Sequence, residues 1–363
     1  MKNKLTVISI FITLLIVISG SGVPQKKSSG KERPLNIILF IGDGMGPAQV
    51  SAAIAASSNP LIFEYFPYSG FAKTPSSDNY ITDSAAGGTA MACGVKTRNG
   101  MIGMGPDSSV VVSIMELAHK KGLSTGLVST SAITHATPAS FVAHNSGRGN
   151  YEDIALDFMK DNIDVFIGGG SDHFNKRKDS IDLTKKLTEQ GYDVIYNIEA
   201  LSKSKSKKIA GLLSGAHMGK PLEDRGGKLE KMTEKAIQTL SKNKNGFILM
   251  VEGSQIDFAG HANDLQWNLS EVIDLNNAIV KAIDFAQSSG NTLVVVTADH
   301  ETGGLILPGG DLETRSVAGK FCSTDHTAVM VPIFSFGPAA ERFSGIHENT
   351  FFFHEFASLL NLK

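Results

Sequence analysis

Asp257 and His261 carry metal-binding side chains and are spaced by about one helical turn. Residues four apart on a helix face the same direction, so both side chains could bind one metal ion. The same spacing is common in surface ion pairs, and taken alone it favours that simpler interpretation. Five more residues of these types follow apolar runs and favour the metal site: Glu252, Asp299, His300, Asp43 and His326. Carboxylates buried at such positions would need cations to offset their desolvation.

The residue types in these clusters suit two kinds of ion. Zinc favours nitrogen and carboxylate ligands in fours, whereas magnesium favours oxygen ligands and retained water. Three separate clusters indicate more than one ion. Two neighbouring ions are a recurring device for stabilising the attacking and leaving oxygens in phosphoryl transfer.

Ser84 is a candidate nucleophile. It lies in the small-residue run from Thr82 to Ala90, which predicts the start of a tightly packed helix. Free backbone N–H groups and the helix macrodipole at that end would attract an anion. Without the metal ligands, a plain N-cap serine is the simpler interpretation. With zinc on its oxygen, the serine would need no histidine nearby as a base.

Arg148 is a candidate anion-binding residue. It follows the segment around Thr137, in the sequence Asn145-Ser146-Gly147-Arg148, which indicates an exposed loop. Its planar guanidinium could bind two phosphate oxygens at once. A lone arginine in a loop usually has no specific role, so the spacing alone does not assign it one.

Short apolar runs rich in branched residues predict the strands that position these side chains. They span residues 36–41, before Asp43; 124–129, before His135 and Thr137; 247–251, before Glu252; and 292–297, before Asp299 and His300. Helical patterns cover residues 111–121, 228–241 and 268–287. This alternation predicts an α/β fold with a doubly wound, mostly parallel central sheet and helices on both faces. In such sheets ligands bind beyond the carboxyl ends of the strands, where the polar clusters fall.

The composition suits one large globular domain or one domain with long insertions. The chain has 363 residues, of which 42% are hydrophobic and 19% charged, with a formal net charge of −2. That balance gives no reason to expect nucleic-acid recognition. Cys93 and Cys322 are the only cysteines, which excludes a disulfide-built scaffold and favours free buried thiols over a pair.

The first residues predict a secretory signal peptide. Lys2 and Lys4 precede an apolar run over residues 5–18, and small residues follow to position 22. An uncleaved membrane anchor is the alternative, although the run is shorter than the roughly 20 residues of a membrane span. We therefore expect a signal peptide over residues 1–22, a polar tether over 23–35 and a single catalytic domain over 36–363. The mature protein is expected to be periplasmic or secreted.

Together these motifs resemble the alkaline phosphatase family, along nearly the whole chain from Asn36 to about Pro338. Seven segments carry the resemblance: Ile41-Gly42-Asp43-Gly44-Met45-Gly46, Thr82-Asp83-Ser84-Ala85-Ala86, Gly94-Val95-Lys96-Thr97-Arg98-Asn99-Gly100, Ala136-Thr137-Pro138-Ala139, Val251-Glu252-Gly253, Thr297-Ala298-Asp299-His300 and Asp325-His326-Thr327.

The resemblance implies a role for each candidate residue. One zinc ion would be held by Asp257, His261 and His326, and a second, which activates Ser84, by Asp43, Asp299 and His300. Asp43 would bridge toward a magnesium site completed by Thr137 and Glu252, and Arg148 would grip the phosphoryl oxygens. The implied reaction is hydrolysis of small-molecule phosphate monoesters by double displacement, through a phosphoserine on Ser84.

Two positions depart from the enteric bacterial pattern of that family. His135 stands where that enzyme has an aspartate near magnesium, so the third site could hold zinc or cobalt instead. Phe258 stands where it has a lysine near phosphate. The interval from Asp299 to His326 leaves little room for the crown insertion by which many relatives dimerise, so both a homodimer and a monomer stay open.

Three other functions compete with this one. A phosphodiesterase or a sulfatase of the same superfamily would resemble this chain in its metal frame, but Ser84 and Arg148 argue against both. A non-enzymatic phosphate-binding protein would be expected to have lost a ligand or the nucleophile, and none is missing here.

Overall fold

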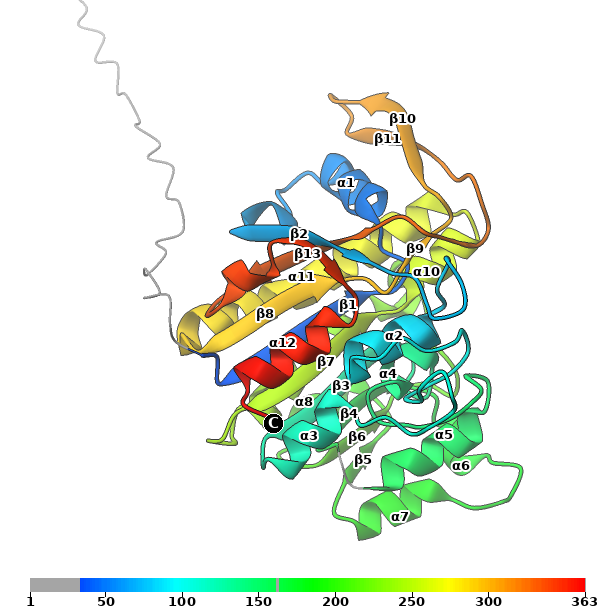
Figure 1. Ribbon diagram of the computed structural model, residues 1–363, viewed down its shortest axis with the longest axis vertical. Helices are drawn as coiled ribbons and strands as arrows, with labels where there is room; N and C mark the ends of the chain where they lie inside the picture. Colours follow the sequence, from blue (N-terminus) through cyan, green and yellow to red (C-terminus); the bar gives the residue numbers. More distant parts are fainter. Residues whose placement is uncertain (1–32, 161–162, 363) are drawn as a thin grey trace, which may run out of the picture.

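A ten-stranded sheet forms the centre of the molecule in the computed structural model, which describes residues 33–160 and 163–362 (Figure 1). Across the sheet the strands run β14 (Gly345–Glu348), β2 (Tyr68–Lys73), β13 (Val331–Phe336), β8 (Thr292–Thr297), β1 (Asn36–Gly42), β7 (Phe247–Gly253), β3 (Ser124–Ala132), β4 (Val165–Gly169), β6 (Ile209–Leu212) and β5 (Asp193–Ile195). Neighbours from β8 to β5 are parallel, whereas β13 is antiparallel to both β8 and β2. The sheet is therefore mostly parallel, as predicted.

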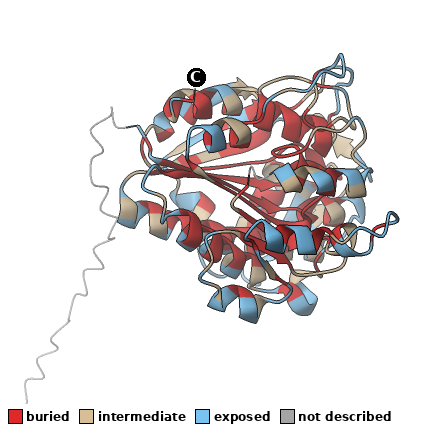
Figure 2. Cartoon of the chain, turned by 90° about the horizontal axis from the view of Figure 1, so that it is seen from below, coloured by how far each residue is buried: buried red, intermediate tan, exposed pale blue. Residues whose placement is uncertain are grey.

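Helices cover both faces of this sheet, so that its middle is buried between two layers (Figure 2). One layer contains α1 (Pro47–Ala56), α9 (Lys228–Leu240) and α11 (Leu265–Ser289), and the other contains α2 (Ser84–Cys93), α3 (Ile114–Lys120), α4 (Ala136–Ala139) and α12 (Phe351–Leu359). Every residue of β1, β7 and β8 is buried. Strands covered on both faces read as continuous apolar runs, which is why the sequence revealed these three.

The predicted helices form, but two of them begin at residues other than those predicted, because N-cap residues set where each helix starts. We expected a helix from residue 111, but α3 begins at Ile114 because Ser113 and Glu116 form a capping box. We expected another from residue 268, but α11 begins at Leu265, where the Asp264 side chain accepts a hydrogen bond from the Trp267 N–H.

Shorter elements surround the main layers. The other α-helices of the described residues are α5 (Tyr151–Asp157), α6 (Asp172–Asn175), α7 (Leu183–Glu189), α8 (Ile198–Lys203) and α10 (Gln255–His261). The interval between Asp299 and His326 folds into a hairpin of β10 (Ile306–Asp311) and β11 (Ser316–Lys320), which projects from the body in Figure 1. A separate two-stranded sheet pairs β9 (Glu301–Thr302) with β12 (His326–Thr327).

The two cysteines are both free, as expected, but only one is buried. Cys93 ends α2 inside the core, whereas Cys322 is exposed because it lies in the loop between β11 and β12. The expectation of a buried thiol was therefore wrong for Cys322.

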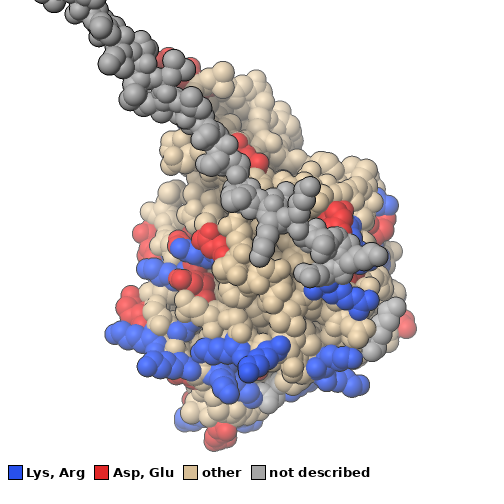
Figure 3. All heavy atoms as spheres, turned by 90° about the vertical axis from the view of Figure 1, so that its left-hand side faces the viewer, with Lys and Arg blue, Asp and Glu red and all other residues tan. Residues whose placement is uncertain are grey.

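The surface carries both signs of charge. Figure 3 shows Lys and Arg side chains gathered across the lower part of the face that lies on the left in Figure 1. No helix in residues 33–160 or 163–362 is long and apolar enough to cross a membrane. The predicted signal peptide and nearly all of the predicted tether lie outside the described residues.

Candidate active site

The predicted ligands meet beyond the carboxyl ends of the central strands and form three groups. Within each group the ligand atoms lie no more than 4.8 Å apart. The groups are Asp257, His261 and His326; Asp43, Asp299 and His300; and Asp43, His135 and Glu252. Asp43 follows β1, Asp299 and His300 follow β8, and Glu252 lies in β7. Since these strands are adjacent and parallel, their ends converge on one edge of the sheet.

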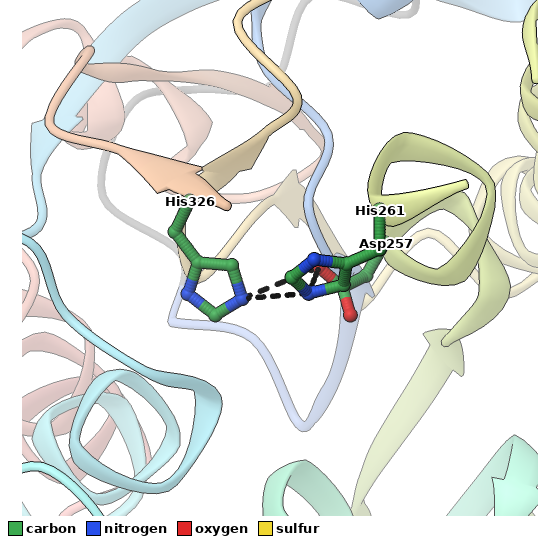
Figure 4. A group of neighbouring side chains, drawn as sticks. All are labelled: Asp257, His261 and His326. Atoms are coloured by element: carbon green, nitrogen blue, oxygen red, sulfur yellow. Dashed lines mark hydrogen bonds and ion pairs between the residues drawn. The ribbon is translucent and has the colours of Figure 1, made fainter. Parts of the chain in front are cut away.

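The first group joins α10 to the small strand β12 (Figure 4). Asp257 Oδ1 lies 3.3 Å from His261 Nε2 and 3.4 Å from His326 Nε2, and the two Nε2 atoms are 3.2 Å apart. The Nδ1 atom of His261 donates to the Thr324 carbonyl, and that of His326 donates to the Thr82 carbonyl. Because a carbonyl only accepts, Nδ1 carries a proton in each ring, so Nε2 is the atom that would bind an ion once the ion displaces any proton there.

The second group surrounds His300, which is fully buried. His300 Nε2 lies 3.4 Å from Asp43 Oδ1, 3.2 Å from Asp299 Oδ2 and 3.3 Å from Ser84 Oγ. On the other side of the ring, Nδ1 lies 3.2 Å from Thr302 Oγ1. The Thr302 hydroxyl gives its one proton to Asp257 Oδ1, so it accepts from His300 Nδ1, and the lone pair of His300 lies on Nε2.

The third group shares Asp43 with the second. Thr137, in α4, donates to Asp43 Oδ2 across 3.4 Å, and Glu252 Oε2 accepts a 2.6 Å hydrogen bond from Ser129 Oγ. His135 precedes α4, and its Nδ1 has no hydrogen-bond partner. Thr137 thus lies beside Asp43.

Burial leaves the carboxylates of the second and third groups in need of positive charge. Burial, aided by the charge of Asp299, raises the pKa of Asp43 well above its ordinary value. Burial likewise raises the pKa of Asp299 to about 6 and that of Glu252 to about 7. One oxygen of each of these carboxyl groups is buried without a hydrogen-bond partner. Metal ions would satisfy these atoms and keep the carboxylates ionised, so the donor set fits cations.

In the first group the surroundings lower the pKa of the carboxyl group instead of raising it. Burial raises the pKa of Asp257, but hydrogen bonds from His261 and His326 outweigh it and hold that pKa well below the ordinary value. The same contact raises the pKa of His261 to about 9. Two imidazoles around one carboxylate suit zinc, which accepts nitrogen ligands and replaces the protons.

Ser84 is the first residue of α2 and is nearly completely buried. The structure places it one position inside the helix, because Asp83 is the N-cap and accepts a 2.9 Å hydrogen bond from the Ala86 N–H. The other oxygen of Asp83 lies 2.9 Å from Arg148 Nη1. Arg148 is half-buried, and this contact holds it beside the residue that precedes Ser84, although it comes from a distant loop.

The sequence interpretation gave no role to Asp83, which lies beside Ser84 and contacts Arg148. An Asp one residue before a small-residue helix is an N-cap signal, but nothing in the sequence shows that its second oxygen pairs with Arg148 65 residues later.

The two residues that depart from the enteric pattern contact each other. The rings of His135 and Phe258 are 5.8 Å apart and nearly perpendicular, and His217 lies edge-on to both. Burial lowers the pKa of His135 to about 3, so its imidazole is neutral and can act as a ligand.

Known proteins match this chain over most of its length. The sequence model of the alkaline phosphatase family matches residues 35–317. Alkaline phosphatase 4 of Bacillus subtilis is 36% identical, and the match covers 96% of this chain and 95% of that protein. The structure of the alkaline phosphatase from the Antarctic bacterium TAB5 is 40% identical, with a TM-score of 0.86 over 91% of this chain and 98% of that one.

A variant of the TAB5 enzyme is equally similar. It has aspartate in place of its His135 and magnesium bound in the site called M3, and its TM-score is 0.87 at 39% identity, over 91% of this chain and 99% of that one. The family match over most of the chain and the agreement in fold lead to one assignment. This chain belongs to the alkaline phosphatase family, whose members hydrolyse phosphate monoesters.

Proposed function

We propose that Ser84 attacks the phosphorus of a phosphate monoester and becomes a covalent phosphoserine. The bond from Oγ to phosphorus forms as the bond to the ester oxygen breaks. The Ser84 hydroxyl proton passes to solvent, and the leaving alkoxide takes a proton from solvent to become the alcohol. Water then hydrolyses the phosphoserine to Ser84 and inorganic phosphate. The observation that carries this proposal is the position of Ser84 Oγ, which is buried at the amino end of α2 and 3.3 Å from His300 Nε2.

We propose zinc for the first two groups and magnesium for the third. Asp257, His261 and His326 would hold one zinc ion and Asp43, Asp299 and His300 the other, while Asp43, Thr137 and Glu252 would hold magnesium. When bound, these ions supply positive charge for the serine oxygen, the leaving oxygen and the phosphoryl oxygens. The unpartnered oxygens of Asp43, Asp299 and Glu252 support this assignment.

Arg148 and α2 would bind the phosphoryl group. The guanidinium can donate two parallel hydrogen bonds, and the free N–H groups at the start of α2 favour an anion. Asp83 would orient the guanidinium, because Nη1 is already bonded to its carboxylate. These groups recognise phosphate itself, which supports broad specificity for small phosphate monoesters rather than for nucleic acid.

His135 would alter the third site. The TAB5 variant with aspartate in place of its His135 has magnesium in the M3 site. An imidazole nitrogen in place of a carboxylate oxygen would favour zinc or cobalt over magnesium.

A phosphate-trapping experiment tests the proposed mechanism. The purified enzyme is mixed with a labelled phosphate monoester at low pH, quenched in acid and digested, and the labelled peptide is identified. We expect the label on Ser84, its loss in Ser84→Ala, and its retention in Ser288→Ala, which alters an exposed serine of α11. Label on another residue, or full turnover by Ser84→Ala, would contradict the covalent mechanism.

Substrate class and export need separate tests. Chromogenic phosphate monoester, phosphate diester and sulfate, each with and without a chelator, separate the proposed activity from a phosphodiesterase and a sulfatase. We also propose cleavage near residue 22 and a periplasmic or secreted protein with residues 36–363 as its catalytic domain. Sequencing the amino terminus of the protein from each cell fraction tests that proposal.

A further inference from the structure

Glu301 is a buried carboxylate next to the second ligand group, but it belongs to none of the three groups. Only 3% of the residue is exposed. Oε1 accepts from Gln49 Nε2 at 2.7 Å and from the Leu305 N–H at 3.2 Å, while Oε2 accepts from the Gly304 N–H at 3.2 Å and from the Thr327 hydroxyl. These four bonds use the acceptor sites of a carboxylate, so Glu301 is fully hydrogen-bonded without a cation.

The local backbone is shaped to supply these donors. Gly303 and Gly304 have φ angles of +92° and +57°, which turn the chain so that the following N–H groups point back at Glu301. Gly46, at the start of α1, leaves room for the side chain, since a Cβ atom there would lie 2.3 Å from Glu301 Cγ. The backbone around Glu301 thus provides both the space for its side chain and two of its hydrogen-bond donors.

The bond to Thr327 crosses from β9 to β12. In this antiparallel pair Glu301 lies opposite Thr327, and Thr302 lies opposite His326. Strands of two residues have little stability of their own, so a side-chain bond between them matters for their register. Thr302 in turn donates to Asp257 Oδ1, which connects β9 to the other ligands of the first group.

We propose that Glu301 is a positioning residue that holds β12 in register with β9 and thereby presents His326 to the first metal group. The effect should be selective. His326 is the one ligand carried by β12, whereas Asp43 and Asp299 follow strands of the central sheet. This inference rests on the zinc sites proposed above. It adds that Glu301 helps to set the zinc affinity of the first of them.

Zinc titration of the full-length mature enzyme tests this inference. Metal-free protein is titrated with zinc against a chromogenic chelator, for the parent and for Thr327→Val, which keeps the side-chain shape but loses the donor to Glu301. We expect at least two tight zinc ions in the parent, at the first two groups. In Thr327→Val one of them should bind about 10 to 100 times more weakly, the usual effect of removing a residue that orients a ligand, and the other should be unchanged.

Two further variants sharpen the result. Thr327→Ser keeps the hydroxyl and should restore parental binding, whereas Glu301→Gln, which loses one acceptor oxygen, should repeat the selective loss even if Thr327→Val does not fold. Unchanged affinity at both sites, or equal weakening of both with a matching fall in the melting temperature of the metal-free protein, would overturn the inference. A parent that binds no zinc would instead overturn the proposed metal assignment.

Discussion

The Asp83 carboxylate joins α2 to Arg148: one oxygen caps the helix and the other lies 2.9 Å from Arg148 Nη1. The proposed nucleophile Ser84 and the proposed phosphate-binding side chain of Arg148 are thus both held next to the same group. This arrangement explains how a loop 65 residues away is aligned with the first turn of α2.

Removing the Asp83 carboxylate should therefore have two separable effects. In Asp83→Ala the lost N-cap should lower the free energy of unfolding by about 1 kcal/mol. The freed Arg148 should also bind phosphate less well, raising the inhibition constant of phosphate several-fold. Denaturant unfolding measures the loss of stability, and inhibition assays measure the binding of phosphate. Asp83→Ser keeps a capping oxygen, so it should recover the stability but not the phosphate binding. Equal phosphate inhibition in parent and Asp83→Ala would show that Asp83 does not position Arg148.

Arg148→Ala should lower kcat/KM by an amount equivalent to about 2 to 4 kcal/mol in the barrier, because a charge-assisted bidentate contact is lost. Inhibition by phosphate should weaken in parallel. Arg148→Lys keeps the charge without the planar fork and should recover only part of the loss. If phosphate inhibits all three proteins alike, Arg148 is not in the phosphate site.

Metal removal should destabilise the protein more at pH 8 than at pH 5.5. In the metal-free chain the pKa of Asp299 is raised to about 6 and that of Glu252 to about 7, against about 4 when unfolded. The folded chain holds these protons more tightly than the unfolded chain does. Protonation of these two groups therefore stabilises the fold fully below about pH 4, and this stabilisation is lost as the pH rises through 6 and 7.

Bound ions remove that loss by neutralising the carboxylates, and a ligand at 100 times its Kd stabilises by about 2.7 kcal/mol. Melting temperatures of chelated and metal-reloaded protein at both pH values provide the measurement. A chelation effect of the same size at both pH values would mean that these carboxyl groups contribute little to the difference.

His135→Asp should make the third site more selective for magnesium. An oxygen ligand replaces a nitrogen ligand, and the added charge favours a hard cation. Metal content after dialysis against mixed zinc and magnesium, together with activity across a magnesium titration, measures the change. His135→Asn offers an oxygen without the charge and should give a smaller shift. Identical third-site metal content in parent and His135→Asp would show that His135 does not set the metal selectivity of that site.

The sequence by itself determined the parts of this protein that depend on local pattern. Central strands such as β1 and β8 are buried on both faces and must be apolar throughout, so their ends and the polar residues after them could be read directly. Asp257 and His261 could be paired because one short helix fixes their relative direction.

Tertiary structure alone decided the contacts between distant segments. The edge strand β14 and its neighbour β2 are only partly buried, so their sequence patterns are weak and their pairing depends on the strands beside them. The bond between Asp83 and Arg148, and the pairing that places His326 opposite Thr302, join positions whose separation in sequence carries no periodic signal. Such contacts form only when packing of the whole sheet brings its loops to one edge, and the active-site geometry depends on them.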